Sequence, residues 1–145
     1  MLEKKTRSNH TNAFHDLQVR VYVADTDFSG VVYHARYLEF FERGRSEFLR
    51  GTGFNNKLFA SGFEGEKLFF VVRHMEINFS RSAQIDNLLT IKTRISRIQG
   101  ARFFMEQYIL RDESMLVAAK VEIALINEEG KPRRLPKELF STIAV

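Results

Sequence analysis

The stretch ADTDFSGVVYHARYLEFFERGR, residues Ala24–Arg45, changes its pattern halfway along. Its first half contains two aspartates, a serine and a glycine, which are residue types typical of turns. From Ala35 to Gly51 the apolar residues recur at helical spacing instead. The face that they share holds Tyr37, Phe40, Phe41, Gly44 and Phe48. The sequence therefore predicts a tight turn followed at once by one long amphipathic helix, which Gly51 and Gly53 end.

Gly44 is unusual because it lies inside this predicted helix, on its apolar face. A glycine in a helix interior costs about 1 kcal/mol relative to alanine. We therefore expect Gly44 to mark a point where the helix comes very close to a packed surface.

Strand patterns lie on both sides of the predicted helix. Apolar and polar residues alternate in Leu17–Ala24 and, most clearly, in Met115–Asn127, which is typical of strands with one buried face. The strands are expected at Leu17–Ala24, Leu68–Phe79, Leu88–Gln99, Arg102–Arg111 and Met115–Asn127. Gly100 and the segment Asp112–Ser114 predict hairpin turns between the later strands. Asn55–Lys67 is expected to be a loop, and Pro136 is expected to open a short terminal helix.

This order, one strand, one long helix and then four strands, predicts an α+β fold rather than alternating βαβ units. A single helix cannot cover both faces of such a sheet, so an edge and a face are left for another subunit. We therefore expect a homo-oligomer. The predicted organisation is a flexible, basic N-terminal tail over residues 1–15 and one domain over residues 16–145.

Composition excludes several classes of protein. The 145 residues suit one domain, and the 14 phenylalanines supply its core. The chain has no cysteine, which excludes disulfides, thiolate metal sites and a cysteine nucleophile. No run of about 20 apolar residues could span a membrane, and no apolar segment of a secretory signal follows the N-terminal charges. We expect a cytoplasmic protein, without a membrane span, whose formal charge of +4 is compatible with a polyanionic ligand.

The turn at Asp25–Gly30 admits several interpretations. Both aspartates could simply shape the turn by accepting hydrogen bonds from nearby amides. A calcium loop would need a bidentate glutamate at its twelfth position, where this chain has Arg36. A serine nucleophile elbow would need a glycine two residues before Ser29, where this chain has Asp27.

A fourth interpretation is that Asp27 works beside the start of the helix. The first backbone N–H groups of a helix have no intrahelical partner and favour an anion or a developing oxyanion. One carboxylate and one such N–H are insufficient for hydrolysis of an amide, because the leaving nitrogen also needs a proton donor. A thioester needs less, since a thiol of pKa about 8.5 departs as the thiolate.

Three blocks of this sequence resemble a known family. They are VRVYVADTDFSGVVYHARYLEFFERGRSEFLR (Val19–Arg50), FFVVRHMEINFSRSAQIDNLLTI (Phe69–Ile91) and PRRLPKEL (Pro132–Leu139). Together they are similar to the YbgC-type acyl-CoA thioesterases, in the 4-hydroxybenzoyl-CoA thioesterase-like branch of the hotdog-fold superfamily. The resemblance implies an antiparallel sheet wrapped around a central helix, and an acyl-CoA thioester hydrolase.

The resemblance also assigns roles to residues. It implies that Asp27 is the catalytic residue, acting as nucleophile or general base, and that the backbone N–H of His34 polarises the thioester carbonyl. Gly30, Tyr33, Arg81 and Ser82 are expected to contact the substrate. The role of the His34 side chain stays open. Nothing in the sequence calls for a metal or a cofactor, and no nucleic-acid-binding signature is present.

Partners follow from the resemblance as well. It implies active sites at the interface of a dimer, or of a dimer of dimers that forms a homotetramer. Acyl carrier protein is a possible second substrate carrier. The alternative is a protein that binds acyl-CoA or acyl carrier protein as a scaffold of the Tol–Pal cell-envelope system. A hotdog dehydratase is disfavoured because its His-Phe-Pro signature is missing.

A set of basic residues on two neighbouring strands has two readings. It is either a solvated sheet face or a contact site for the phosphates of coenzyme A, which arginine geometry suits. These residues are Lys92, Arg94, Arg97, Arg102 and Arg111.

Overall fold

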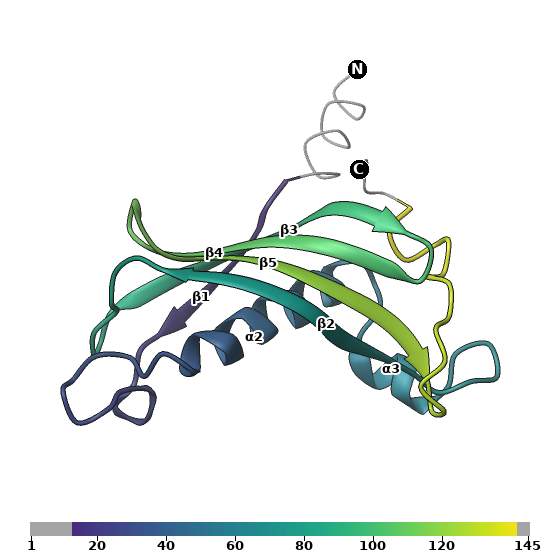
Figure 1. Ribbon diagram of the computed structural model, residues 1–145, viewed down its shortest axis with the longest axis horizontal. Helices are drawn as coiled ribbons and strands as arrows, with labels where there is room; N and C mark the ends of the chain where they lie inside the picture. Colours follow the sequence, from purple (N-terminus) through teal and green to yellow (C-terminus); the bar gives the residue numbers. More distant parts are fainter. Residues whose placement is uncertain (1–12, 142–145) are drawn as a thin grey trace, which may run out of the picture.

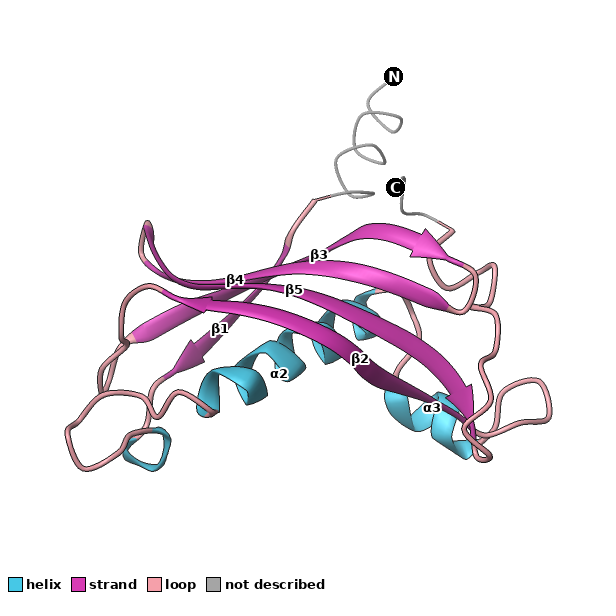
Figure 2. Ribbon diagram, in the orientation of Figure 1, coloured by secondary structure: helices cyan, strands magenta, loops and turns pink. Residues whose placement is uncertain are grey.

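One long helix, α2 (Arg36–Gly51), lies against the concave face of an antiparallel sheet in the computed structural model, which describes residues 13–141 (Figure 1). The sheet has five strands in the order β1-β3-β4-β5-β2. Their bounds are His15–Arg20 for β1, Leu68–Phe79 for β2, Leu88–Gln99 for β3, Arg102–Arg111 for β4 and Ser114–Asn127 for β5. The predicted α+β fold, an antiparallel sheet wrapped around one helix, is confirmed (Figure 2).

Three predicted elements differ in the structure. β1 ends at Arg20, because the chain then turns into a short 3-10 helix, η1 (Val23–Asp25), whose start is fixed by a hydrogen bond from Tyr22 N to Asp25 Oδ2. The expected loop contains a second helix, α3 (Asn56–Ser61), capped by Asn55 through its side chain. After Pro136 the described residues form turns rather than the expected helix.

The tail prediction falls largely outside the described residues. Residues 1–12 are among those the structure does not describe. His15 already opens β1, and the Phe14 ring lies 5.6 Å from the Tyr108 ring, so both residues contact the sheet.

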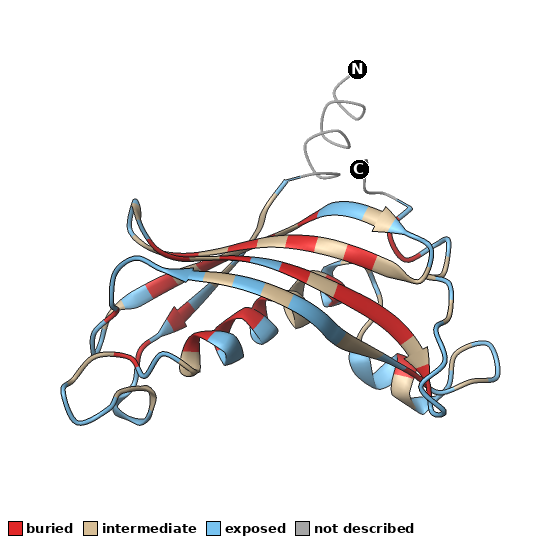
Figure 3. Ribbon diagram, viewed as in Figure 1, coloured by how far each residue is buried: buried red, intermediate tan, exposed pale blue. Residues whose placement is uncertain are grey.

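Buried and more exposed residues alternate along much of the sheet, so its two faces differ (Figure 3). The face toward α2 is apolar and buried; its fully buried members include Leu89, Ile91, Ile109 and Val117. The opposite face carries the charged positions of the same strands, such as Arg94 and Glu106. Phe40 and Phe41 of α2 complete the core and have no exposed surface.

The contact between α2 and the sheet is closest at Gly44, as its position predicts. A methyl group added at Gly44 would lie 2.8 Å from Ile91 Cγ2, 2.8 Å from Thr93 Oγ1 and 3.1 Å from Gln107 Nε2. The fully buried Gln107 amide donates to the Phe41 carbonyl at 2.9 Å and to Thr93 Oγ1 at 2.9 Å. The helix is therefore attached to β4 by a buried hydrogen bond and lies in close contact with β3.

β1 and β2 are the two edges of the sheet. β2 is the longer edge, with 12 residues, and it exposes three large apolar side chains, Phe69, Val72 and Phe79. The pairing register shifts between Val72 and His74 on β2, between Ile95 and Arg97 on β3, and between Ile109 and Leu110 on β4. Such bulges bend strands and increase their twist, which suits a sheet that curves around a helix.

We predict that Gly44→Val lowers the free energy of unfolding by about 1–3 kcal/mol, because the added carbons overlap Ile91 and Thr93. Urea denaturation checks this value. Arg43→Val is the matched control: it puts the same side chain on the exposed side of α2, where the change should be about 0.5 kcal/mol or less. Equal effects at the two positions would contradict the close contact.

Candidate active site

A tight hairpin precedes α2 and carries Asp27. Asp27 N donates to Val31 O at 3.0 Å, and Gly30 N donates to Asp27 O at 3.1 Å. Gly30 has φ +85°, a left-handed conformation that glycine adopts without strain. The glycine therefore allows the chain to reverse within a few residues and leaves Asp27 and Phe28 exposed at the tip.

The Asp27 carboxylate is held on one side only. The backbone N–H of Ser29, at 2.8 Å, and the Ser29 hydroxyl both donate to Oδ1. These bonds, the hydroxyl first, lower the pKa of Asp27 below its ordinary value, because they favour the charged form. No described residue donates a hydrogen bond to Oδ2, so this oxygen is open to an incoming molecule.

Asp25 has a different role from Asp27. Its Oδ2 accepts from Tyr22 N at 2.8 Å and its backbone carbonyl accepts from Tyr33 N at 3.0 Å. Its Oδ1 lies 3.5 Å from Arg36 Nε, at the start of α2. Asp25 thus joins η1, the hairpin and the helix, and it shapes the turn as one of the sequence interpretations expects.

His34 lies two residues before the first residue of α2. Its carbonyl accepts from Tyr37 N at 3.3 Å in the opening turn. Its own backbone N–H donates to no described residue. The His34 side chain is exposed, with its ring 4.7 Å from the Tyr33 ring and 6.2 Å from the Phe79 ring of β2. The N–H is thus available at the positive end of the helix.

The segment between β2 and β3 supports the hairpin from behind. Val32 N donates to the Ala83 carbonyl at 2.9 Å, and Ala83 N donates to the Tyr37 hydroxyl at 2.9 Å. Tyr37 is buried, and burial raises the pKa of its phenol, so the hydroxyl stays neutral. An Arg111 N–H donates to the Ser82 carbonyl at 3.3 Å. These contacts connect the first turn of α2 to the hairpin that carries Asp27.

The residues expected to contact substrate lie along the hairpin and along the segment between β2 and β3 that supports it. Tyr33 is half exposed beside His34, and the Gly30 carbonyl accepts from Ile85 N at 3.4 Å. Ser82 is exposed next to Ala83. Arg81 is exposed, and its guanidinium lies 3.4 Å from the Ser114 hydroxyl at the start of β5. Their contact with substrate stays a prediction.

The basic residues of β3 and β4 are mostly engaged with neighbours on the convex face. Arg94 pairs with Glu106 at 3.2 Å, Arg102 with Glu122 at 3.1 Å and Lys92 with Asp16 at 3.0 Å. The Arg97 guanidinium lies over the Phe104 ring at 4.1 Å. This arrangement favours the reading as a solvated, charge-paired sheet face over the reading as a phosphate contact site.

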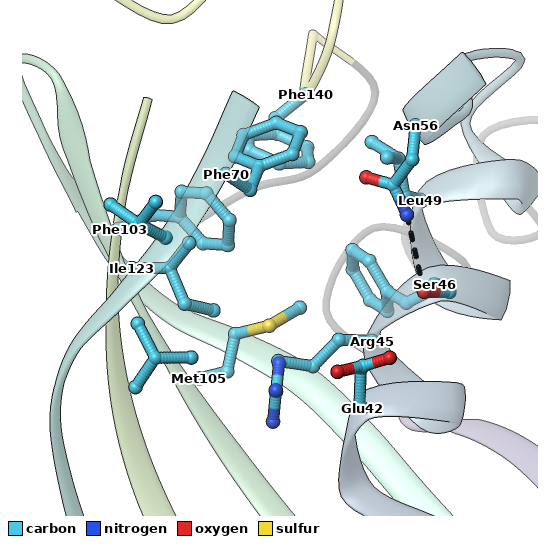
Figure 4. A pocket seen from close by; sticks show the side chains of 13 residues that line it. Glu42, Arg45, Ser46, Leu49, Asn56, Phe70, Phe103, Met105, Ile123 and Phe140 are labelled. Atoms are coloured by element: carbon cyan, nitrogen blue, oxygen red, sulfur yellow. Dashed lines mark hydrogen bonds between the residues drawn. The ribbon is translucent and has the colours of Figure 1, made fainter. Parts of the chain in front are cut away.

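The sequence did not predict a cavity of about 300 Å³ between α2 and β2 (Figure 4). Phenylalanines line much of it, and Arg45 and Glu42 contribute its charges; the phenylalanines are Phe48, Phe70, Phe103 and Phe140. At its rim Asn56 Nδ2 donates to Ser46 Oγ at 3.2 Å. One signal was present in the sequence, because Arg45 lies beside Gly44 and three residues before Phe48, next to the apolar face.

Comparison with known proteins agrees with this architecture. The model of the thioesterase superfamily matches residues 29–118. The acyl-CoA thioesterase YbgC of Haemophilus influenzae is 43% identical over 122 residues, 83% of this chain and 88% of the relative. The acyl-CoA thioester hydrolase YbgC of Escherichia coli O6:H1 is 38% identical over 125 residues, 85% of this chain and 90% of the relative.

A solved structure is more similar still. The crystal structure of a probable thioesterase from Bartonella henselae is 91% identical and superposes with a TM-score of 0.84, covering 86% of this chain and 100% of that chain. The chain belongs to the thioesterase superfamily and is a thioesterase of the hotdog fold. Within that superfamily it is a member of the YbgC type. Over residues 13–141 no helix has the length and apolar character needed to cross a membrane.

We predict that Ser29→Ala moves the acid limb of the pH–rate profile to higher pH. The substitution removes the hydroxyl bond that contributes most to the low pKa of Asp27, so the carboxylate, which the sequence predicts to be the catalytic group, becomes protonated at a higher pH. Turnover of a thioester measured between pH 3 and pH 8 shows the limb. Ser96→Ala, at an exposed position of β3, is the control, and an unchanged limb in Ser29→Ala would contradict the role of the hydroxyl.

Proposed function

We propose that the protein hydrolyses acyl-CoA thioesters to a carboxylic acid and coenzyme A, with Asp27 and the His34 N–H as the reacting groups. The observation that supports this most directly is that both groups lie in one short segment of the chain. A carboxylate with one open oxygen lies seven positions before a backbone N–H that no described residue uses, at the start of a long helix. The names of the YbgC relatives supply the substrate class.

In the proposed reaction the thioester carbonyl oxygen lies at the His34 N–H, which stabilises the negative charge that develops there. Asp27 then acts in one of two ways. As a nucleophile its Oδ2 bonds to the carbonyl carbon, coenzyme A leaves as a thiolate, and water hydrolyses the resulting anhydride. As a general base it accepts a proton from a water that bonds to the same carbon, with the same thiolate as leaving group.

Of these two roles for Asp27, its lowered pKa favours that of nucleophile. A general base works best with a pKa near the working pH, and Ser29 moves the pKa of Asp27 away from neutrality. A nucleophile has to be ionised at the working pH, and the same hydrogen bonds favour the ionised form. Ser29 also occupies Oδ1, so Oδ2 is the oxygen proposed to react.

We also propose that the working unit is an oligomer that pairs through β2, as a dimer or a dimer of dimers. Phe79, at one end of β2, contacts the His34 ring, whereas Phe70, near the other end, lines the cavity. Two β2 edges pairing antiparallel would therefore bring the hairpin of one subunit toward the cavity of the other. The fully exposed Phe28 at the hairpin tip would then be covered. Sedimentation analysis tests this assembly, and a monomer would contradict it.

The carrier of the acyl group is proposed to be coenzyme A in the cytoplasm, with acyl carrier protein as the second possibility. Both carriers present the thioester on the same pantetheine arm. Gly30, Tyr33, Arg81 and Ser82 lie along the hairpin and its support, where they would contact this arm.

Replacing Asp27 by asparagine is expected to lower kcat by at least about a thousandfold with the fold intact, because the open oxygen loses its charge and Asp27 is exposed. Thiol release from a panel of short, long and aromatic acyl-CoA thioesters measures this. Asp16→Asn on the convex face is the control and should retain full turnover. Equal trace rates in wild type and Asp27→Asn would refute catalysis by Asp27 and support the scaffold alternative.

Two substitutions at His34 separate its backbone from its side chain. His34→Pro removes the N–H and should lower kcat about 10²–10³-fold, as loss of one oxyanion donor does elsewhere. His34→Ala keeps the N–H and should stay within about tenfold of wild type. The proline variant should still fold, because proline suits the start of a helix and this N–H serves no described contact. A larger loss in His34→Ala than in His34→Pro would assign the role to the imidazole instead.

A further inference from the structure

We infer that the cavity between α2 and β2 binds a small monocarboxylate with an apolar body, whose carboxylate pairs with Arg45. The inference does not rest on the proposed reaction, because no residue of the same chain's Asp27 hairpin lines this cavity, although the proposed pairing would bring the hairpin of a second subunit toward it. It rests on the position of Arg45, on its hydrogen bonding and on the apolar walls around it (Figure 4).

Arg45 is held in a fixed place by buried groups. An Arg45 N–H donates to Gln107 Oε1 at 3.0 Å. The Gln107 amide cannot easily turn over, since its nitrogen already donates to the Phe41 carbonyl and to Thr93 Oγ1. The amide oxygen is therefore always presented to Arg45. A guanidinium positioned in this way binds with less loss of side-chain freedom than one on a mobile surface arginine.

The positive charge of Arg45 is incompletely compensated. Burial is the main influence on its pKa and lowers it, and the nearby charge of Glu42 raises it by a smaller effect. Arg45 forms no salt bridge with any carboxylate in residues 13–141. The guanidinium has five N–H donors, and Gln107 accepts from one of its nitrogens. The other donors suit a carboxylate, which can accept two parallel hydrogen bonds from one guanidinium.

The walls of the cavity define the rest of the ligand. The rings of Phe48, Phe70, Phe103 and Phe140 leave a space of about 300 Å³, at the lower end of ordinary small-molecule sites. An apolar body of limited size fits there. Glu42, which also lines the cavity, repels a second negative charge and so disfavours phosphates and dicarboxylates. Together these features select a monocarboxylate such as phenylacetate or hexanoate.

The test is a ligand-observed NMR titration of the full chain with phenylacetate and hexanoate, and with 2-phenylethanol and 1-hexanol as uncharged counterparts. We expect a Kd of about 1 mM or tighter for the acids, and binding at least about tenfold weaker for the alcohols. Arg45→Gln should weaken the acids about 10- to 100-fold and leave the alcohols unchanged. Acids and alcohols that bind alike, or no binding at all, would overturn the inference.

Glu42→Gln is the second variant, and it should act in the opposite direction. Glu42 is exposed, so the fold should tolerate the change, and loss of its charge should tighten acid binding about two- to fivefold. Acid binding that is weakened or unaffected in Glu42→Gln would count against the assigned charge arrangement. If Arg45→Gln is too unstable to titrate, the acid binding of Glu42→Gln tests the inference in its place.

Asp27→Asn keeps this test separate from the proposed function, because it should bind the acids as wild type does while losing turnover. Such acids could be products of the reaction or could come from elsewhere. If the acids that bind best are those whose CoA thioesters are hydrolysed fastest, the cavity receives the product. Tight binding of acids whose thioesters are not hydrolysed would assign it to acids from another source. A loss of acid binding in a folded Asp27→Asn variant would contradict the location at Arg45.

Discussion

The close approach of α2 to the sheet at Gly44 is the contact on which the rest of the structure depends. With no side chain at this position, the helix comes near enough for Gln107 of β4 to reach the Phe41 carbonyl and Thr93. That distance fixes the height of the whole helix above the sheet. Because the helix is rigid, it also fixes its first residues, eight positions earlier, where the hairpin and the His34 N–H lie.

The same contact influences the other end of the helix. Gln107 presents its amide oxygen to Arg45, so the close approach also determines where the Arg45 side chain points. The hairpin with Asp27 and the cavity with Arg45 are thus at different places along one helix whose position a single glycine permits. Buried amide networks of this kind are costly when incomplete, and here the Gln107 side chain uses both its nitrogen and its oxygen.

Much of the fold could be predicted from sequence because its determinants are local. The strand candidates and the turn residues between them predicted the bounds of β2, β3 and β4, and the helical period with its closing glycines predicted α2 to within a residue. β1 was predicted too long because the alternating pattern continues beyond Arg20 to Val23, whereas the chain there already turns into η1, which Asp25 closes through a side-chain hydrogen bond. α3 was missed because a short helix capped by one asparagine has no apolar period long enough to recognise.

The candidate site, like the fold, could be predicted from sequence only in its local parts. The turn chemistry around Asp27 and the helix start at His34 could be read from neighbouring residues. The support from Ala83 and Tyr37 could not, since these residues are far apart in the chain and meet only in the folded sheet. The cavity was missed for the same reason, because its phenylalanines come from α2, β2, β4 and the C-terminal segment.

The alternation of the two faces along each strand has a consequence for changes in chain length. Each strand presents alternate residues to α2, so removing one residue from a strand transfers every later side chain to the opposite face. Downstream of a deletion in β4, for example, the position of Gln107 would pass to a residue from the charged face. Insertions and deletions are therefore tolerable only where no face is defined, in the turns at Gly100 and Asp112 and in the segment before β2. These connections are thus the places where the fold accommodates a change in chain length.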